Sequence, residues 1–115
     1  MRTLEQARVV SHGERAMLDE LKRLILGFLP KATVVLYGSV ARGTHHAESD
    51  FDILVLTEEL LSREEEDQVE DAILNFELSH DIVITTILHS NSEWNSAFHR
   101  VVPFHQEVER DAIVL

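Results

Sequence analysis

The 115-residue sequence contains no cysteine. The chain therefore has no disulfide and no thiolate metal ligand, which agrees with the reducing conditions of the cytosol. It also lacks any run of the ~18 to 20 apolar residues that a membrane span requires. Residues 1–10, MRTLEQARVV, have no apolar core of the kind found in a signal peptide. We therefore expect a cytoplasmic protein without a membrane partner.

Positive charge is scarce: 10 lysines and arginines stand against 21 aspartates and glutamates, which gives a net charge of −11. Such a chain repels nucleic acid phosphates, so no direct nucleic acid partner is expected. Much of the acidic excess lies in residues 57–71, where the solvated face of a helix explains it. A phosphate-bearing small ligand stays possible, because a bound divalent cation reverses the local field.

Repeats, low-complexity tracts and flexible linkers are absent, so residues 1–115 are expected to form a single domain. Apolar periodicity predicts helices at 14–29, 63–78 and in the stretch after Pro103, with a short helix near Trp94 for which Ser92 is a candidate cap. Apolar runs predict strands at 32–37, at 51–57 and from Asp81 onward. The resulting order, α-β-β-α-β-α-α, predicts an α/β (α+β) fold in which helices flank a small mixed sheet.

Two carboxylates stand at the head of the second predicted strand. Side chains of a strand alternate between its faces, so Asp50 and Asp52 point the same way. Two ionised carboxylates at such a short distance repel each other. A divalent cation such as Mg²⁺ relieves that repulsion by taking both as ligands. An Asp-x-Asp pair alone also fits a solvated turn that ends a loop.

Gly38 and Ser39 follow directly after the first predicted strand. Glycine at a strand end lets the backbone turn sharply and lets a ligand approach the amide groups. The amides that follow Ser39 are able to donate to phosphate oxygens if a helix begins there, and Arg42 would then lie one turn in. Taken alone, the Gly-Ser pair fits an ordinary β-turn equally well.

The combination of Gly38-Ser39, ten intervening residues and Asp50-x-Asp52 on a second strand resembles the signature of the nucleotidyltransferase superfamily. The stretches GSVARG and SDFDILV resemble the minimal nucleotidyltransferases, which are small single-domain prokaryotic proteins of about this length. The signature covers residues 36–56, and the order of elements extends the resemblance to most of the chain.

The resemblance implies a nucleotidyltransferase fold and a set of site residues. Asp50 and Asp52 would hold two Mg²⁺ ions. Asp81 would be the third catalytic carboxylate and would complete the binding of the metal on the nucleophile side, although His80 before it departs from the apolar residue of the family pattern. Gly38, Ser39 and Arg42 would bind the nucleotide. The implied activity is transfer of a nucleoside monophosphate to an acceptor hydroxyl. The expected donor is ATP, which would give transfer of AMP, and another nucleoside triphosphate is the alternative.

The resemblance also implies a partner, because minimal nucleotidyltransferases often act as antitoxins that adenylylate a tyrosine of a HEPN-domain toxin. A homo-oligomer is an alternative way to complete a shallow site on so small a domain. Two rival functions stay open. One is a non-catalytic antitoxin that neutralises a basic partner by surface contact. The other is an aminoglycoside-type enzyme acting on a small molecule, although the chain has no room for the extra helical domain that usually builds such a pocket.

Overall fold

The computed structural model describes residues 1–45 and 50–115; residues 46–49, within the ten-residue spacer of the motif, lie outside the described residues. The strands are β1 (Arg2–Thr3), β2 (Thr33–Tyr37), β3 (Phe51–Thr57), β4 (Ile84–Ser90) and β5 (Ile113–Val114). The helices are α1 (His12–Phe28), α2 (Gly38–Arg42), α3 (Arg63–His80), α4 (Asn91–Trp94), α5 (Ala97–Arg100) and α6 (Pro103–Asp111).

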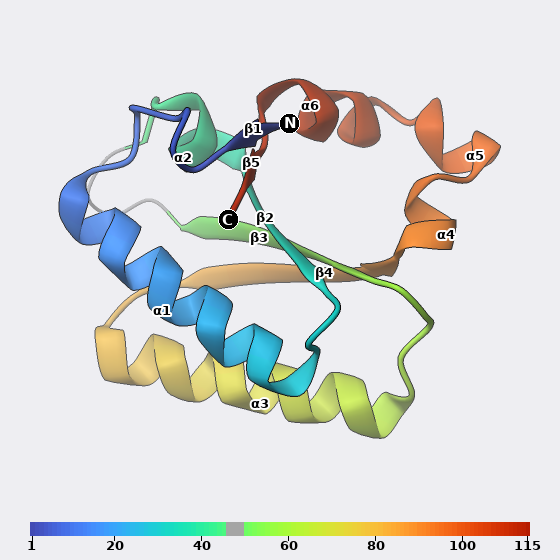
Figure 1. Cartoon of the computed structure of the whole chain (residues 1–115), viewed down its shortest axis with the longest axis horizontal. Coiled ribbons are helices and arrows are strands. Elements are labelled where there is room, and N and C mark those ends of the chain that lie inside the picture. The colour runs from blue at the N-terminus through green and yellow to red at the C-terminus, as the bar shows by residue number, and fades with distance from the viewer. Residues whose placement is uncertain (46–49) are drawn as a thin grey trace.

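The strands form one mixed sheet in the order β1-β5-β2-β3-β4 (Figure 1). β2 pairs antiparallel with both β3 and β5, whereas β3 and β4 pair in parallel, as do β1 and β5. The crossover between the parallel strands β3 and β4 is made by α3. The predicted α/β class, a mixed sheet with flanking helices, is confirmed.

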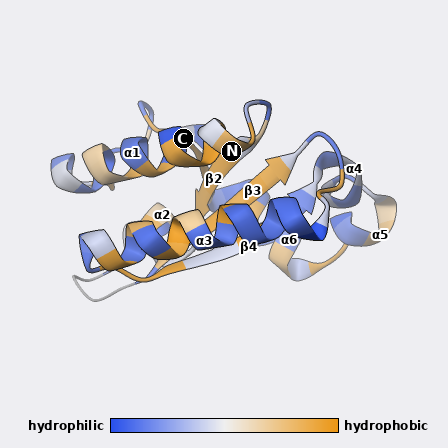
Figure 2. Cartoon of the chain, turned by 90° about the horizontal axis from the view of Figure 1, so that it is seen from below, coloured by the Kyte–Doolittle hydropathy of each residue, from blue (hydrophilic) through white to orange (hydrophobic). Residues whose placement is uncertain are grey.

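Apolar side chains of the central strands alternate between two cores, one on each side of the sheet. α1 and α3 lie side by side over one face and enclose the larger core, while α4 and α6 cover the other face. Figure 2 shows strands β2 and β3 coloured as hydrophobic, among helices in which hydrophilic and hydrophobic residues alternate. The larger core contains Leu18, Leu21, Ile25, Val34, Leu36, Ile53, Val55, Ile73 and Phe76, and the smaller contains Val35, Leu54, Leu56, Trp94 and Val108.

The expected start of the third predicted strand is wrong, because β4 begins at Ile84 instead of at Asp81. α3 begins where expected and continues two residues beyond its expected end, to His80. The longer helix is held at its end by the His80 ring, which stacks on Phe76 at 3.9 Å and lies 2.9 Å from a carboxylate oxygen of Glu20 on α1. Asp81 then closes the helix in the left-handed conformation, which aspartate tolerates better than most residues.

The two short strands at one side of the sheet, β1 and β5, were not predicted. β1 and β5 contain two residues each, too few to show a period-2 pattern in the sequence. Their pairing is carried by backbone bonds and by Arg2, whose guanidinium donates to the carbonyl groups of Ala41 and Asp111 at 2.7 and 2.9 Å. Arg2 thereby ties the ends of α2 and α6 together. None of the helices in the described ranges combines the length and the apolarity needed to cross a membrane.

Three helices begin with the same capping arrangement, which provides a stability prediction. The Ser62 hydroxyl accepts a hydrogen bond from the Glu65 amide at 3.2 Å, and the Glu65 side chain accepts one from the Ser62 amide at 3.0 Å. Ser62→Ala removes the first of these two hydrogen bonds, so we expect it to lower the free energy of unfolding by about 1 kcal/mol. Urea denaturation followed by circular dichroism measures this value.

The matched control comes from α4. Its N-cap is Ser90, not the expected Ser92, which is exposed on the first turn. Ser92→Ala therefore removes no cap and is expected to change stability by less than about 0.5 kcal/mol. Equal losses in the two variants would contradict the role assigned to Ser62.

Candidate active site

Gly38 and Asp52 meet where β2 ends and β3 begins. The antiparallel register places Tyr37 opposite Asp52, and Gly38 then turns the chain out of the sheet with φ +75°. A Cβ atom added to Gly38 would collide with Asp52 Oδ2 and would lie 2.9 Å from Asp52 Cγ. The Asp52 carboxylate therefore rests directly on the backbone of the turn, and only glycine leaves room for it.

The environment of Asp52 makes its negative charge costly. Burial raises the pKa of this half-buried carboxyl, the neighbouring charge of Asp50 raises it further, and Arg42 opposes both effects by lowering it. The charge of Asp52 in turn adds to burial in raising the pKa of the Tyr37 phenol. A cation beside Asp52 would remove this cost. Asp50, one residue before β3 begins, is thus near enough to Asp52 to raise its pKa.

The predicted nucleotide-binding residues lie on α2, which begins at the turn. Gly38 opens this helix and Ser39 follows it, while the N-cap residue Tyr37 offers no side-chain cap to the first amide groups. Arg42 is exposed on the last turn, and Gly43 ends the helix in the left-handed conformation with φ 74°. The structure thus brings Gly38, Ser39 and Arg42 to the same end of the sheet as Asp52.

Asp81 is not brought together with the other two aspartates. It is exposed at the end of α3, three residues before β4 begins. Among residues 1–45 and 50–115, no group of three or more histidine, aspartate or glutamate side chains lies in an arrangement suited to a metal ion. The carboxylate pair is therefore Asp50 and Asp52, with Asp81 outside it.

One element that the motif did not indicate, α6, also borders the site. A cavity of about 120 Å³ separates the turn from α6, and its walls include Tyr37, Gly38 and Arg42. From α6 it is lined by Phe104, Glu107, Val108 and Asp111. The Phe104 ring packs edge-on against Tyr37, with ring centroids 5.4 Å apart. The sequence predicted a helix after Pro103 but gave no sign that this helix faces the turn.

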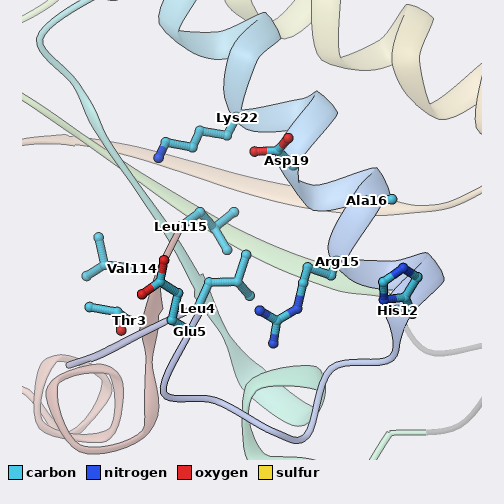
Figure 3. A pocket seen from close by; sticks show the side chains of 10 residues that line it. All are labelled: Thr3, Leu4, Glu5, His12, Arg15, Ala16, Asp19, Lys22, Val114 and Leu115. Carbon is cyan, nitrogen blue, oxygen red and sulfur yellow. The ribbon is translucent and has the colours of Figure 1, made fainter.

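A larger cavity lies elsewhere on the molecule. It has a volume of about 630 Å³ and is lined by residues of α1, of the N-terminal segment and of β5, including Arg15, Asp19 and Lys22 (Figure 3). None of the six predicted site residues lines it. Cavity size therefore does not locate the site; the packing of Asp52 against the turn does.

The residues at the turn fit a hard divalent cation. None of the five ion pairs formed within residues 1–45 and 50–115 includes Asp50 or Asp52. Carboxylate oxygens are the protein ligands that Mg²⁺ takes, usually one or two of them together with substrate phosphates and water. Asp50 and Asp52 would hold such an ion, which would neutralise the charge that raises the pKa of Asp52.

The same residues lie within a stretch that matches a known family. The model of the nucleotidyltransferase domain matches residues 15–111, which include the turn, both aspartates and all of α6. The chain belongs to the nucleotidyltransferase domain family. The resemblance seen in residues 36–56 is thereby confirmed, and the chain is an enzyme of the nucleotidyltransferase class.

One relative and two solved structures extend this comparison. A protein of Methanocaldococcus jannaschii whose assigned name is protein adenylyltransferase is 32% identical over 75 residues, which cover 65% of this chain and 76% of the relative. A crystal structure of a toxin–antitoxin with AMP-PNP matches with a TM-score of 0.59 at 22% identity, covering 84% of this chain and 69% of that one.

The second structure is of the toxin–antitoxin MntA-HpeT, in a mutant in which two aspartates one residue apart are replaced by glutamates. It matches with a TM-score of 0.55 at 18% identity, covering 82% of this chain and 68% of that one. At such low identity these two likenesses establish the fold, which is that of nucleotidyltransferases.

Proposed function

We propose that this nucleotidyltransferase transfers AMP from ATP to a hydroxyl group of a partner protein and acts as the antitoxin of a toxin–antitoxin pair. The single observation that carries the proposal is the packing of the Asp52 carboxylate on the Gly38 turn, with Asp50 beside it. The name of the archaeal relative supports adenylyl transfer to protein, and the AMP-PNP in one neighbour supports ATP as the donor. The partner that we propose is a HEPN-domain toxin.

Mg²⁺ bound to Asp50 and Asp52 would supply charge neutralisation at the phosphates. Residues of the chain would supply the remaining contacts with the nucleotide. The backbone at Gly38 and Ser39 would lie against the phosphate tail, and Arg42 would meet it from the end of α2. The acceptor oxygen then attacks the α-phosphorus, the bond from that phosphorus to the oxygen bridging to the β-phosphate breaks, pyrophosphate leaves, and the hydroxyl proton is released.

Incubation of the protein with ATP labelled in the adenine or α-phosphate, Mg²⁺ and the HEPN-domain protein encoded beside it tests this function. We expect label on the partner and an increase in the partner's mass by one AMP group. EDTA should abolish the transfer, because the carboxylates hold the metal with the nucleotide. Transfer of the γ-phosphate instead of AMP would contradict the proposal, as would an unlabelled partner.

One observation favours a second function, neutralisation by surface contact alone. The outer side of α3 combines two exposed leucines, Leu74 and Leu78, with a dense row of acidic side chains. The exposed acidic residues of this helix are Glu64, Glu65, Asp67, Glu70 and Asp71. A basic protein surface would complement this face. Full neutralisation of the toxin by an Asp50→Asn/Asp52→Asn variant would favour this function over adenylyl transfer.

A further inference from the structure

The side chain beside Asp52 on the neighbouring strand is that of Thr85. The parallel register of β3 and β4 pairs Asp52 with Thr85, just as it pairs Phe51 with Ile84. Because paired residues of a sheet point to the same face, Thr85 and Asp52 share one face while Phe51 and Ile84 are buried on the other. Thr85 is exposed, so its hydroxyl faces the space into which Asp52 points.

No other residue of β4 occupies that place. The next residue of β4 on this face, Ile87, lies beside Leu54 and packs in the smaller core. Asp81 precedes Thr85 by four residues and lies outside the strand, in the left-handed turn that ends α3. On this face Asp52 therefore has a phenol on one side, Tyr37 of β2, and a hydroxyl on the other.

The number of cations that the site holds follows from its charge. A second divalent ion, about 3.5 to 4 Å from the first, needs further anionic oxygen ligands from the protein or the substrate. Asp50 and Asp52 provide two negative charges, and Thr85 provides none. A neutral hydroxyl offsets little of the cost of placing two dications side by side.

We propose that Thr85 occupies the place at which a third carboxylate would complete a two-metal centre, so that this chain holds one divalent cation instead of two. The inference rests on the proposed function, in which Asp50 and Asp52 bind the metal–nucleotide complex. It assigns to Thr85 a positioning role: its hydroxyl borders the single ion and the phosphate tail without carrying charge. Asp81 has no part in metal binding.

Counting bound Mn²⁺ tests this proposal without reference to activity. Each variant is titrated with Mn²⁺ at a saturating level of a non-hydrolysable ATP analogue, and electron paramagnetic resonance measures the free ion. We expect one Mn²⁺ per chain for the natural protein and two for Thr85→Asp. Thr85→Asn, which has nearly the same shape as Thr85→Asp but no charge, and Asp81→Asn are both expected to keep one.

Two tightly bound ions in the natural protein would overturn the inference, as would loss of an ion in Asp81→Asn. Failure of Thr85→Asp to gain a second ion, with a circular dichroism spectrum like that of the natural protein, would also overturn it. Absence of any nucleotide-dependent Mn²⁺ binding to the natural protein is a different result. It would overturn the proposed function itself and, with it, the assignment of Thr85.

Discussion

Asp52→Asn is expected to lower the rate of AMP transfer by at least about 10³-fold, equivalent to roughly 4 kcal/mol of lost transition-state stabilisation. The amide keeps the size of the side chain and its place on the Gly38 backbone but removes the charge that would hold the cation. Single-turnover assays with labelled ATP and a saturating acceptor protein measure this effect directly, because they separate the transfer step from product release.

The fold should survive this substitution. Asp52 has a pKa above its ordinary value, so the folded chain binds its proton more tightly than the unfolded chain does. Folding stability therefore falls as pH rises through the range between the two pKa values, and at neutral pH the ionised group costs stability. Asp52→Asn removes that cost and is expected to be at least as stable as the natural protein at pH 7.

Asp71→Asn is the matched control, since it makes the same chemical change on the exposed side of α3. It is expected to keep the transfer rate within a factor of about two, because a surface charge distant from the turn is screened by solvent and salt. A similar loss of rate in Asp71→Asn and Asp52→Asn would show that general acidity, and not this carboxylate, supports the reaction.

Gly38→Ala is expected to lower the transfer rate by about 10²-fold and to destabilise the protein by about 1 to 2 kcal/mol. The stability loss arises because alanine at φ +75° is strained. The rate loss arises because the new methyl group collides with the Asp52 carboxylate, and a shift of about 1 Å at a reacting centre costs activity on this scale. Thermal denaturation and the single-turnover assay measure the two effects on the same sample.

Gly27→Ala provides the contrast. Gly27 lies in α1, and a Cβ atom there would meet nothing within 4 Å. The substitution should raise stability by roughly 0.5 to 1 kcal/mol, because alanine is the better helix former, and it should leave the transfer rate unchanged. If Gly38→Ala behaved like Gly27→Ala, the close packing of the turn against Asp52 would have no functional consequence.

The elements that build the core were predictable because their apolar residues follow a clear pattern along the sequence. The stripes of α1 and α3 and the buried run of β3 give clear signals, and all three elements form close to the expected bounds. The predictions that were wrong concern positions at which a single residue determines the backbone conformation. Whether Asp81 begins a strand or ends a helix depends on a single left-handed conformation and on the contact of His80 with Glu20, sixty residues away in sequence.

The same limit applies to the site. The resemblance of Gly38-Ser39 and Asp50-x-Asp52 to a family signature predicted a site shared by the turn and the aspartates, and the antiparallel pairing of β2 with β3 brings Asp52 against Gly38. The neighbour of Asp52 on β4 was not predictable, because it depends on the register of two strands separated by the whole of α3. A one-residue shift in that register would turn Thr85 away from the site.

Paramagnetic broadening by Mn²⁺ tests the location of the metal–nucleotide site most directly. In a ¹⁵N-labelled sample with the non-hydrolysable ATP analogue, addition of Mn²⁺ should broaden the amide resonances of Gly38, Ser39, Asp52 and Thr85. The resonance of Lys22, which lines the larger cavity and lies about two turns beyond Arg15 along α1, should be broadened much less. Broadening centred on that cavity, or the same pattern in an Asp50→Asn/Asp52→Asn variant, would contradict the account.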